Sequence, residues 1–153
     1  MKGYVESNFA KHLLAWPGMA VLASLNGAIR ELTYADRLGQ EQAHRLATVP
    51  LMVMLAQYFA FLAWKWPLRS MAEAWRLGAA WLGLTLAFEF GLGRLEGKPW
   101  SELFGEYNVV AGRIWIVVVL FILAGPALTW RLSHRRTQGD RPPAGGEVEP
   151  TGA

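Results

Sequence analysis

The sequence contains no cysteine, which excludes disulfide bonds, thiolate zinc sites and a cysteine nucleophile. It has no internal repeat and no phosphate-binding glycine loop, since the motif at 91–93 lacks a third glycine and follows a predicted helix. A strong charge of one sign is also absent: the net charge is +3, and the basic residues sit beside apolar segments. This pattern suits lipid headgroups, so no nucleic-acid partner is expected.

What the chain does have is apolar residues gathered into four blocks between charged segments. Hydrophobic residues make up 53% of the chain, which is little more than the roughly 45–50% of soluble domains, so their arrangement is the informative feature. About 20 apolar residues cross a bilayer as a helix. The sequence therefore predicts an all-α membrane protein, a four-helix transmembrane bundle. The predicted spans are about 13–29, 46–66, 74–93 and 114–130.

The segments outside these spans are short. The N-terminal lead, with Lys2 and Lys11, resembles a secretory signal, but Glu6 interrupts it and three more apolar blocks follow, so we expect a retained first span. In the third connection, Ser101 is expected to cap a short helix that lies in the membrane interface. Residues 131–153, which contain several Pro and Gly residues, are expected to form a disordered cytoplasmic tail.

Tryptophan and basic residues support the spans and predict their orientation. Of eight tryptophans, all except Trp81 fall near a predicted span end, as in the aromatic belts of membrane proteins. With a cytoplasmic N-terminus, the cytoplasmic segments carry most of the Lys and Arg residues, including the cluster from Arg131 to Arg136. We therefore expect a multi-pass protein with both termini in the cytoplasm.

The third predicted span contains a carboxylate, Glu89, within an otherwise apolar helix. An ionisable group there is costly, so it normally has a partner or a function. The same helix has a small residue at every fourth position, in a stripe of Ala79, Gly83, Ala87 and Gly91. Glu89 lies about 160° around the helix from this stripe. We expect the stripe to pack against other helices and Glu89 to face a polar interior.

Other polar residues fall at the same predicted outer interface as Glu89. The candidate polar cluster comprises Asn26, Arg30, Glu31, His44, Glu89, Arg94, Asn108 and Arg113. We interpret Glu89 first as a structural ion pair with Arg30, Arg94 or Arg113. The alternatives are proton or cation handling in a polar cavity, and simple snorkelling toward the interface. Glu31 follows Arg30 directly, so it is expected to point elsewhere.

Signatures of cofactors and catalysis are missing. His12 and His134 are predicted on the opposite side of the membrane from His44, which argues against a haem held by two histidines. Ser24 and His44 could form a hydrolase pair, but no Gly-x-Ser-x-Gly motif surrounds the serine, which lies on a stripe of small residues. The sequence therefore predicts no cofactor, no metal site and no catalytic residue.

Three short sequence motifs occur together in this chain. They are Asn26-Gly27-Ala28-Ile29-Arg30-Glu31, Phe88-Glu89-Phe90 followed by Gly91 and Gly93, and Tyr107-Asn108 with Gly112-Arg113-Ile114-Trp115. The combination resembles a family of uncharacterised small bacterial inner-membrane proteins with four predicted spans, and the likeness covers roughly residues 13–130. The resemblance implies a bacterial inner-membrane protein and carries no activity with it.

The sequence favours a non-enzymatic integral membrane protein of unknown specific function, structural or partner-binding, with its polar cluster near the outer interface. Its expected partners are the lipid bilayer and either a second copy of the chain or another membrane protein. The alternative is a small transporter or channel-like protein in which Glu89 exchanges a proton or binds a cation. A third hypothesis is a lipid-processing enzyme that uses the outer polar cluster.

Overall fold

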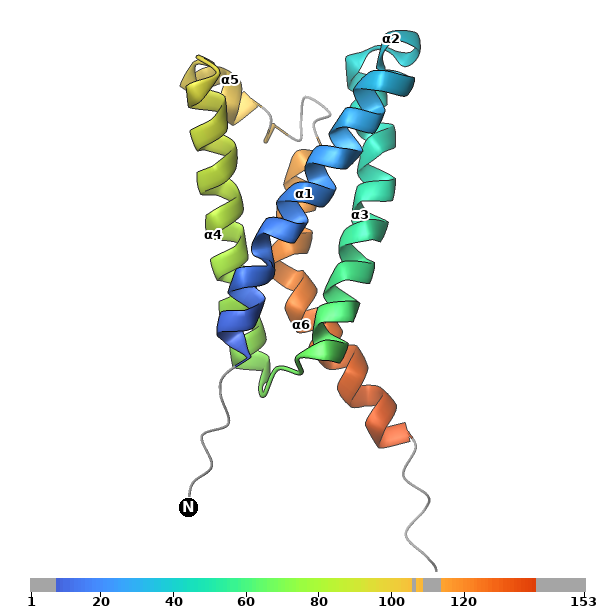
Figure 1. The fold of residues 1–153 in the computed structure, drawn as a ribbon, viewed down its shortest axis with the longest axis vertical. Helices are drawn as coiled ribbons and strands as arrows, with labels where there is room; N and C mark the ends of the chain where they lie inside the picture. The colour runs from blue at the N-terminus through green and yellow to red at the C-terminus, as the bar shows by residue number, and fades with distance from the viewer. Residues whose placement is uncertain (1–7, 106, 109–113, 140–153) are drawn as a thin grey trace, which may run out of the picture.

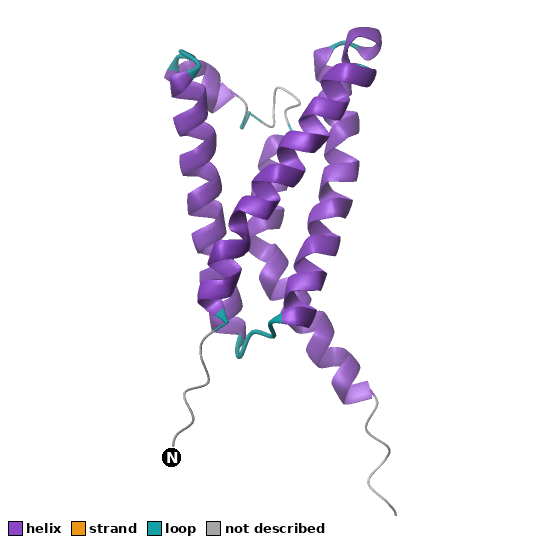
Figure 2. Cartoon of the chain, viewed as in Figure 1, coloured by secondary structure: helices purple, strands orange, loops and turns teal. Residues whose placement is uncertain are grey.

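The computed structural model describes residues 8–105, 107–108 and 114–139, and within these residues the regular elements are helices (Figures 1 and 2). The helices are α1 (Phe9–Thr33), α2 (Ala35–Leu38), α3 (Gln40–Lys65), α4 (Met71–Leu95), α5 (Trp100–Gly105) and α6 (Trp115–Gly139). The expected all-helical architecture is therefore confirmed for the described part of the chain. The four long helices are α1, α3, α4 and α6, and they correspond in order to the four predicted spans.

Three of these helices, α1, α3 and α6, are long and apolar enough to cross a membrane. Helix α4 has 25 residues, the same length as α1, but it is not in this group. Its sequence includes four charged residues, Glu73, Arg76, Glu89 and Arg94. Three helices thus have the length and hydropathy that a membrane span requires.

Helix α6 continues beyond the predicted end of the fourth span. The expected disordered tail was placed from residue 131, but α6 runs to Gly139, so this prediction is wrong for residues 131–139. The physical reason is that Arg131, Leu132 and Arg135 are good helix formers, and no proline or glycine interrupts them before Gly139. The rest of the predicted tail, residues 140–153, lies outside the described residues.

The short helix predicted in the third connection is present as α5, although its first residue is Trp100. The carbonyl of Pro99 accepts hydrogen bonds from the backbone N–H groups of Glu102 (3.1 Å) and Leu103 (3.2 Å). Pro99 therefore precedes the first turn, and Ser101, the predicted cap, lies inside the helix. The Leu103 side chain is buried against Gly93 near the end of α4.

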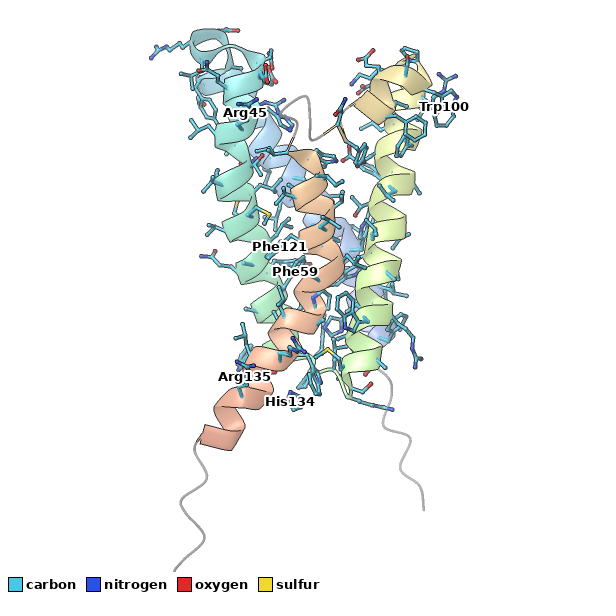
Figure 3. The ribbon with its side chains drawn as sticks, turned by 180° about the vertical axis from the view of Figure 1, so that it is seen from behind. Arg45, Phe59, Trp100, Phe121, His134 and Arg135 are labelled. Atoms are coloured by element: carbon cyan, nitrogen blue, oxygen red, sulfur yellow. The ribbon has the colours of Figure 1, made fainter. Side chains whose placement is uncertain are left out.

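The core lies where α3, α4 and α6 meet. The Phe59 ring of α3 stacks on Trp81 of α4, with centroids 5.2 Å apart, and on Phe121 of α6, at 5.6 Å (Figure 3). Helices α4 and α6 approach each other closely at Gly78. A Cβ atom at this position would collide with the backbone carbonyl of Leu123. The absence of a side chain at Gly78 thus permits this contact.

The small-residue stripe of α4 faces outward, contrary to the expectation that it would pack inside the bundle. Its four members, Ala79, Gly83, Ala87 and Gly91, are all exposed, and a Cβ atom at Gly83 or Gly91 would meet nothing within 4 Å. The buried face of α4 instead contains Ala74, Leu77, Gly78, Trp81, Thr85 and Gly93. The large side chains on that face make far more dispersion contacts than the stripe could offer.

One end of the bundle, where α1 begins, is closed by aromatic side chains. The Trp81 indole N–H donates to the carbonyl of His12 (3.1 Å), and the rings of His12 and Trp66 lie 6.0 Å apart in an edge-on arrangement. Phe59 stacks on Trp81 from α3. We call His12, Phe59, Trp66 and Trp81 the aromatic floor.

The long helices diverge toward the opposite end, where α2 and α5 lie. Figure 1 shows α4 on one side of the molecule and α3 on the other, with α1 crossing in front and α6 behind. Helix α1 touches α4 near the aromatic floor, where the Trp16 indole N–H donates to the Thr85 hydroxyl (3.2 Å) and the Trp16 ring meets Phe88 edge-on at 5.8 Å. Beyond this contact the two helices separate.

Candidate functional site

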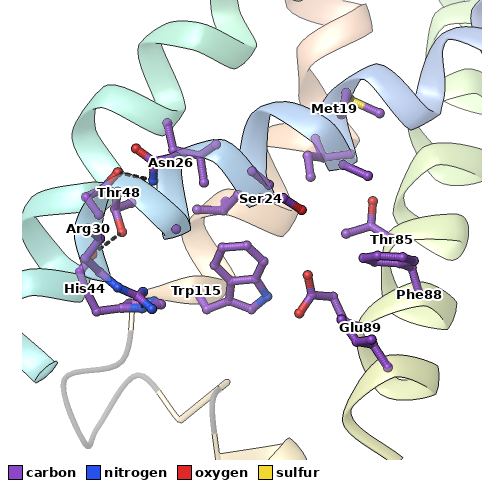
Figure 4. Close-up of a pocket in the computed structure, with 18 of the residues that line it drawn as sticks. Met19, Ser24, Asn26, Arg30, His44, Thr48, Thr85, Phe88, Glu89 and Trp115 are labelled. Atoms are coloured by element: carbon purple, nitrogen blue, oxygen red, sulfur yellow. Dashed lines mark hydrogen bonds between the residues drawn. The ribbon is translucent and has the colours of Figure 1, made fainter. Parts of the chain in front are cut away.

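A cavity of about 880 Å³ occupies the space between the diverging helices. Side chains from α1, α3, α4 and α6 line it, so it begins where α1 and α4 separate and extends toward α2 and α5 (Figure 4). Its volume lies within the roughly 300–1,000 Å³ that is typical of small-molecule sites. Its polar lining includes Asn26, Arg30, His44, Thr48, Thr85 and Glu89.

The deep part of this cavity is apolar. Met19, Leu51, Leu55, Val118 and Ile122 line it, and each is almost completely buried. The aromatic floor lies directly beneath, because His12, Phe59 and Trp81 are each one helical turn from cavity residues of the same helix. The cavity is therefore closed at its apolar end and polar toward the other end.

Arg30 is the centre of the polar contacts on one wall. Its Nε and Nη2 atoms both donate to one oxygen of Glu31, at 3.1 and 2.6 Å, and the Gln40 amide donates to the other oxygen (3.2 Å). The prediction that Glu31 points away from Arg30 is therefore wrong. Adjacent residues start about 100° apart on a helix, but the long Arg30 side chain bends back to its neighbour at the helix end.

His44 lies against the same guanidinium. The distance between Arg30 Nη1 and His44 Nδ1 is 2.8 Å, and the His44 ring meets Trp115 edge-on at 6.1 Å. Because a guanidinium only donates, Nδ1 must be the acceptor, and the imidazole proton is then on Nε2. This contact joins α1 to the start of α3 at the polar end of the cavity.

Asn26 also joins α1 to α3, one turn from Arg30 toward the predicted centre of the membrane. It is buried, and its side-chain amide donates to the carbonyl of Ala47 at 2.9 Å (Figure 4). The Thr48 hydroxyl donates to the carbonyl of His44 (3.0 Å), which satisfies a second polar group on this wall. Asn26 and Thr48 therefore have structural contacts within the cavity wall.

Glu89 lines the cavity from α4, on the wall opposite Arg30 and His44 (Figure 4). Of its three predicted partners, Arg30 pairs with Glu31. Arg94 donates to the carbonyl of Lys98 (2.8 Å) and lies over the Trp100 ring at 5.2 Å. The third, Arg113, lies outside the described residues. The ion pairs in which both partners are described residues join Arg30 to Glu31, Arg45 to Glu41 and Lys98 to Glu96.

The cavity brings together half of the predicted polar cluster. Asn26, Arg30, His44 and Glu89 line it, whereas Glu31, Arg94 and Asn108 do not. Helix periodicity in the sequence places Thr85 on the same side of the helix as Glu89, one turn away, but it does not predict the cavity walls formed by Trp16, Phe88 and Trp115. The contact of Trp16 with Thr85 spans 69 positions and leaves no sequence signal.

Within the part of the chain that the structure describes, no group of three or more histidine, aspartate or glutamate side chains could hold a metal ion. The chemistry on the walls is hydrogen bonding, ion pairing and apolar contact. Comparison with protein-family models, with curated protein sequences and with solved structures finds no match for this chain.

Proposed function

We propose that this chain is a non-enzymatic, multi-pass protein of the bacterial inner membrane that binds a ligand in the cavity between α1, α3, α4 and α6. In this proposal α4 is the fourth span, and both termini lie in the cytoplasm. The path of the chain supports a fourth span. Helix α3 ends at the aromatic floor, and α6 begins at the opposite end, so α4 must connect the two ends (Figure 1).

The single observation that carries ligand binding is the shape and lining of the cavity. It is large, it is closed at the aromatic floor, and its surface changes from apolar to polar along its depth. A closed apolar end favours a binding site over a continuous channel. Sites of this kind bind their ligands through apolar surface and orient them with a few polar groups.

The test is to block the cavity and measure what the purified full-length chain retains. Ser24 lines the cavity on α1, and a tryptophan there would place a large ring within it. Ala28 is one turn further along, is exposed and does not line the cavity, so Ala28→Trp is the matched control. Mass spectrometry of the organic extract should find a species that wild type and Ala28→Trp retain and Ser24→Trp loses. Identical extracts from all three proteins would overturn the proposal.

A second candidate function, proton- or cation-coupled transport, is favoured by the position of Glu89 in the cavity wall. This function predicts that Glu89→Gln folds normally but abolishes pH-dependent flux in proteoliposomes. Glu73→Gln is the control, because Glu73 lies at the first turn of α4, outside the cavity, and glutamine can replace it in a capping box. Flux that is equal in both variants and in wild type excludes this function.

A further inference from the structure

We propose that the cavity holds one acyl chain of a zwitterionic glycerophospholipid, with the headgroup between Arg30 on α1 and Glu89 on α4. This inference rests on the proposed function, since it names the ligand class for the same cavity. It follows from three properties of the described residues: the depth of the cavity, the balance of charge at its polar end, and the exposed edge between α1 and α4.

The depth of the cavity matches one leaflet of a bilayer. Arg30 lines its polar end, and Met19 lies in its apolar part, about one turn from Trp16, which is the other limit of the lining on α1. At 1.5 Å per residue, Arg30 and Met19 are separated by about 16 Å along the helix axis. The hydrocarbon core of a bilayer is about 30 Å thick, so one leaflet contributes about 15 Å. An acyl chain that begins beside Arg30 therefore ends near Met19, Leu51 and Leu55.

The charges that line the cavity are balanced. The cations are Arg30, Arg45 and Lys98, and the anions are Glu41, Glu89 and Glu96. Each of these cations has a carboxylate partner: Arg45 pairs with Glu41 (2.7 Å) and Lys98 with Glu96 (3.0 Å). Arg30 pairs with Glu31 (2.6 Å), which does not line the cavity. A headgroup that carries both a phosphate and an ammonium group matches this balance better than a purely anionic one.

Arg30 and Glu89 lie on opposite walls of the cavity, with the Trp115 ring between them in the view of Figure 4. A guanidinium has five N–H donors, and the contacts with Glu31 and His44 use three of them. A carboxylate can accept about four hydrogen bonds, so a group such as Glu89 can bind an ammonium group and a protein donor at the same time. Arginine suits phosphate, and the carboxylate suits an ammonium group. Arg30 can thus bind the phosphate of a zwitterionic headgroup, and Glu89 can bind its ammonium group.

The edge of the cavity between α1 and α4 is exposed. Ser24 on α1 is exposed, and on α4 the side chains of Phe88 and Leu92 are 40% and 45% exposed. All three line the cavity, so its side wall is open beyond the contact between Trp16 and Phe88. A lipid can enter sideways through this edge without its chain crossing water.

Two variants block this edge in different ways. Ser24→Trp fills the opening with a large ring. Gly27→Leu is the milder variant: Gly27 lines the cavity, a Cβ atom there meets nothing within 4 Å, and leucine is a better helix former than glycine. If Ser24→Trp fails to fold, as judged by gel filtration and helical circular dichroism, the result rests on Gly27→Leu. Ala28→Trp is again the control.

The experiment offers the full-length chain in detergent an equimolar mixture of phosphatidylethanolamine and phosphatidylglycerol with identical acyl chains. The protein is then repurified, and the bound lipid is quantified. Wild type and Ala28→Trp should retain a single phospholipid per chain, enriched roughly tenfold in the zwitterionic species. The blocked variants should lose roughly tenfold of this retention. Equal retention by the blocked variants, or no preference for the zwitterionic lipid, overturns the inference.

These outcomes are distinguishable from failure of ligand binding itself. If the blocking substitution removes a species other than a zwitterionic glycerophospholipid from the organic extract, the proposed function stands and this inference is wrong. If no species is removed, both are wrong.

Discussion

Asn26 is a buried polar side chain that connects α1 directly to α3. Its amide donates to the backbone carbonyl of Ala47 at 2.9 Å, in the wall of the cavity. The Ala47 carbonyl can also accept a backbone hydrogen bond within α3, so this carbonyl stays hydrogen-bonded when the Asn26 amide is removed. The stability of the α1–α3 pair therefore depends on one side-chain hydrogen bond that can be deleted without leaving an unpaired carbonyl.

We predict that Asn26→Ala lowers the free energy of unfolding by about 1 kcal/mol, the usual contribution of a single interhelical hydrogen bond. The measurement is unfolding in a detergent mixture followed by circular dichroism. Gln57→Ala is the control, because Gln57 lies on the exposed side of α3. A change at Gln57 as large as the change at Asn26 would contradict the assignment.

At the residue scale, the positions of Asn26, Arg30, His44 and Glu89 at the predicted span ends indicate that they lie at one level, because the ends of antiparallel helices meet there. The ion pair of Arg30 with Glu31 has no such sequence signal. Helix geometry separates the Cβ atoms of adjacent residues, but it does not limit where a long side chain ends. The ion pair depends on two residues of α3: His44 contacts Arg30, and Gln40 donates to Glu31.

At the scale of elements, hydropathy predicted where helices occur but not which face of α4 packs. The stripe of Ala79, Gly83, Ala87 and Gly91 permits close packing, and so does Gly78 on the other side of the helix. The choice depends on the neighbours: Leu77 and Trp81 flank Gly78 on the buried face. A stripe of small residues indicates that a helix can pack closely on that face. Whether it does so depends on the side chains of the neighbouring helix.

This choice of face predicts opposite effects for two glycine substitutions in α4. Gly78→Ala places a methyl group against the backbone carbonyl of Leu123, so α4 and α6 must separate. We expect a loss of about 1–3 kcal/mol, as in other overpacked cores. Gly83→Ala adds its methyl group to open space and should be neutral or stabilise α4 by up to about 1 kcal/mol.

The two variants are compared by thermal unfolding of the purified protein. Each replaces one glycine of the same helix by alanine, so the intrinsic helix propensity changes equally. The difference between them therefore isolates the contact with α6. If Gly78→Ala were as stable as Gly83→Ala, the close approach of α4 and α6 would be contradicted.

At the scale of the whole molecule, the cavity exists because α4 and α3 stand on opposite sides while α1 crosses in front, away from α4 and toward α3 (Figure 1). No local pattern encodes this divergence, which explains why the sequence predicted a polar cluster and not an open space. The same arrangement makes α4 the connection between the two ends of the bundle. Its crossing of the bilayer therefore has a direct experimental consequence.

Because the sequence contains no cysteine, the side of the membrane on which each end of α4 lies can be measured with a single introduced cysteine. No other residue has to be replaced. Arg69 lies just before α4, and Glu102 lies in α5 beyond its other end; both are exposed. If α4 spans the membrane with cytoplasmic termini, a membrane-impermeant maleimide added to intact cells should label Glu102→Cys and leave Arg69→Cys unlabelled. Permeabilised cells should show labelling of both. Labelling of both in intact cells, or of neither, would place the two ends of α4 on one side and exclude a fourth span.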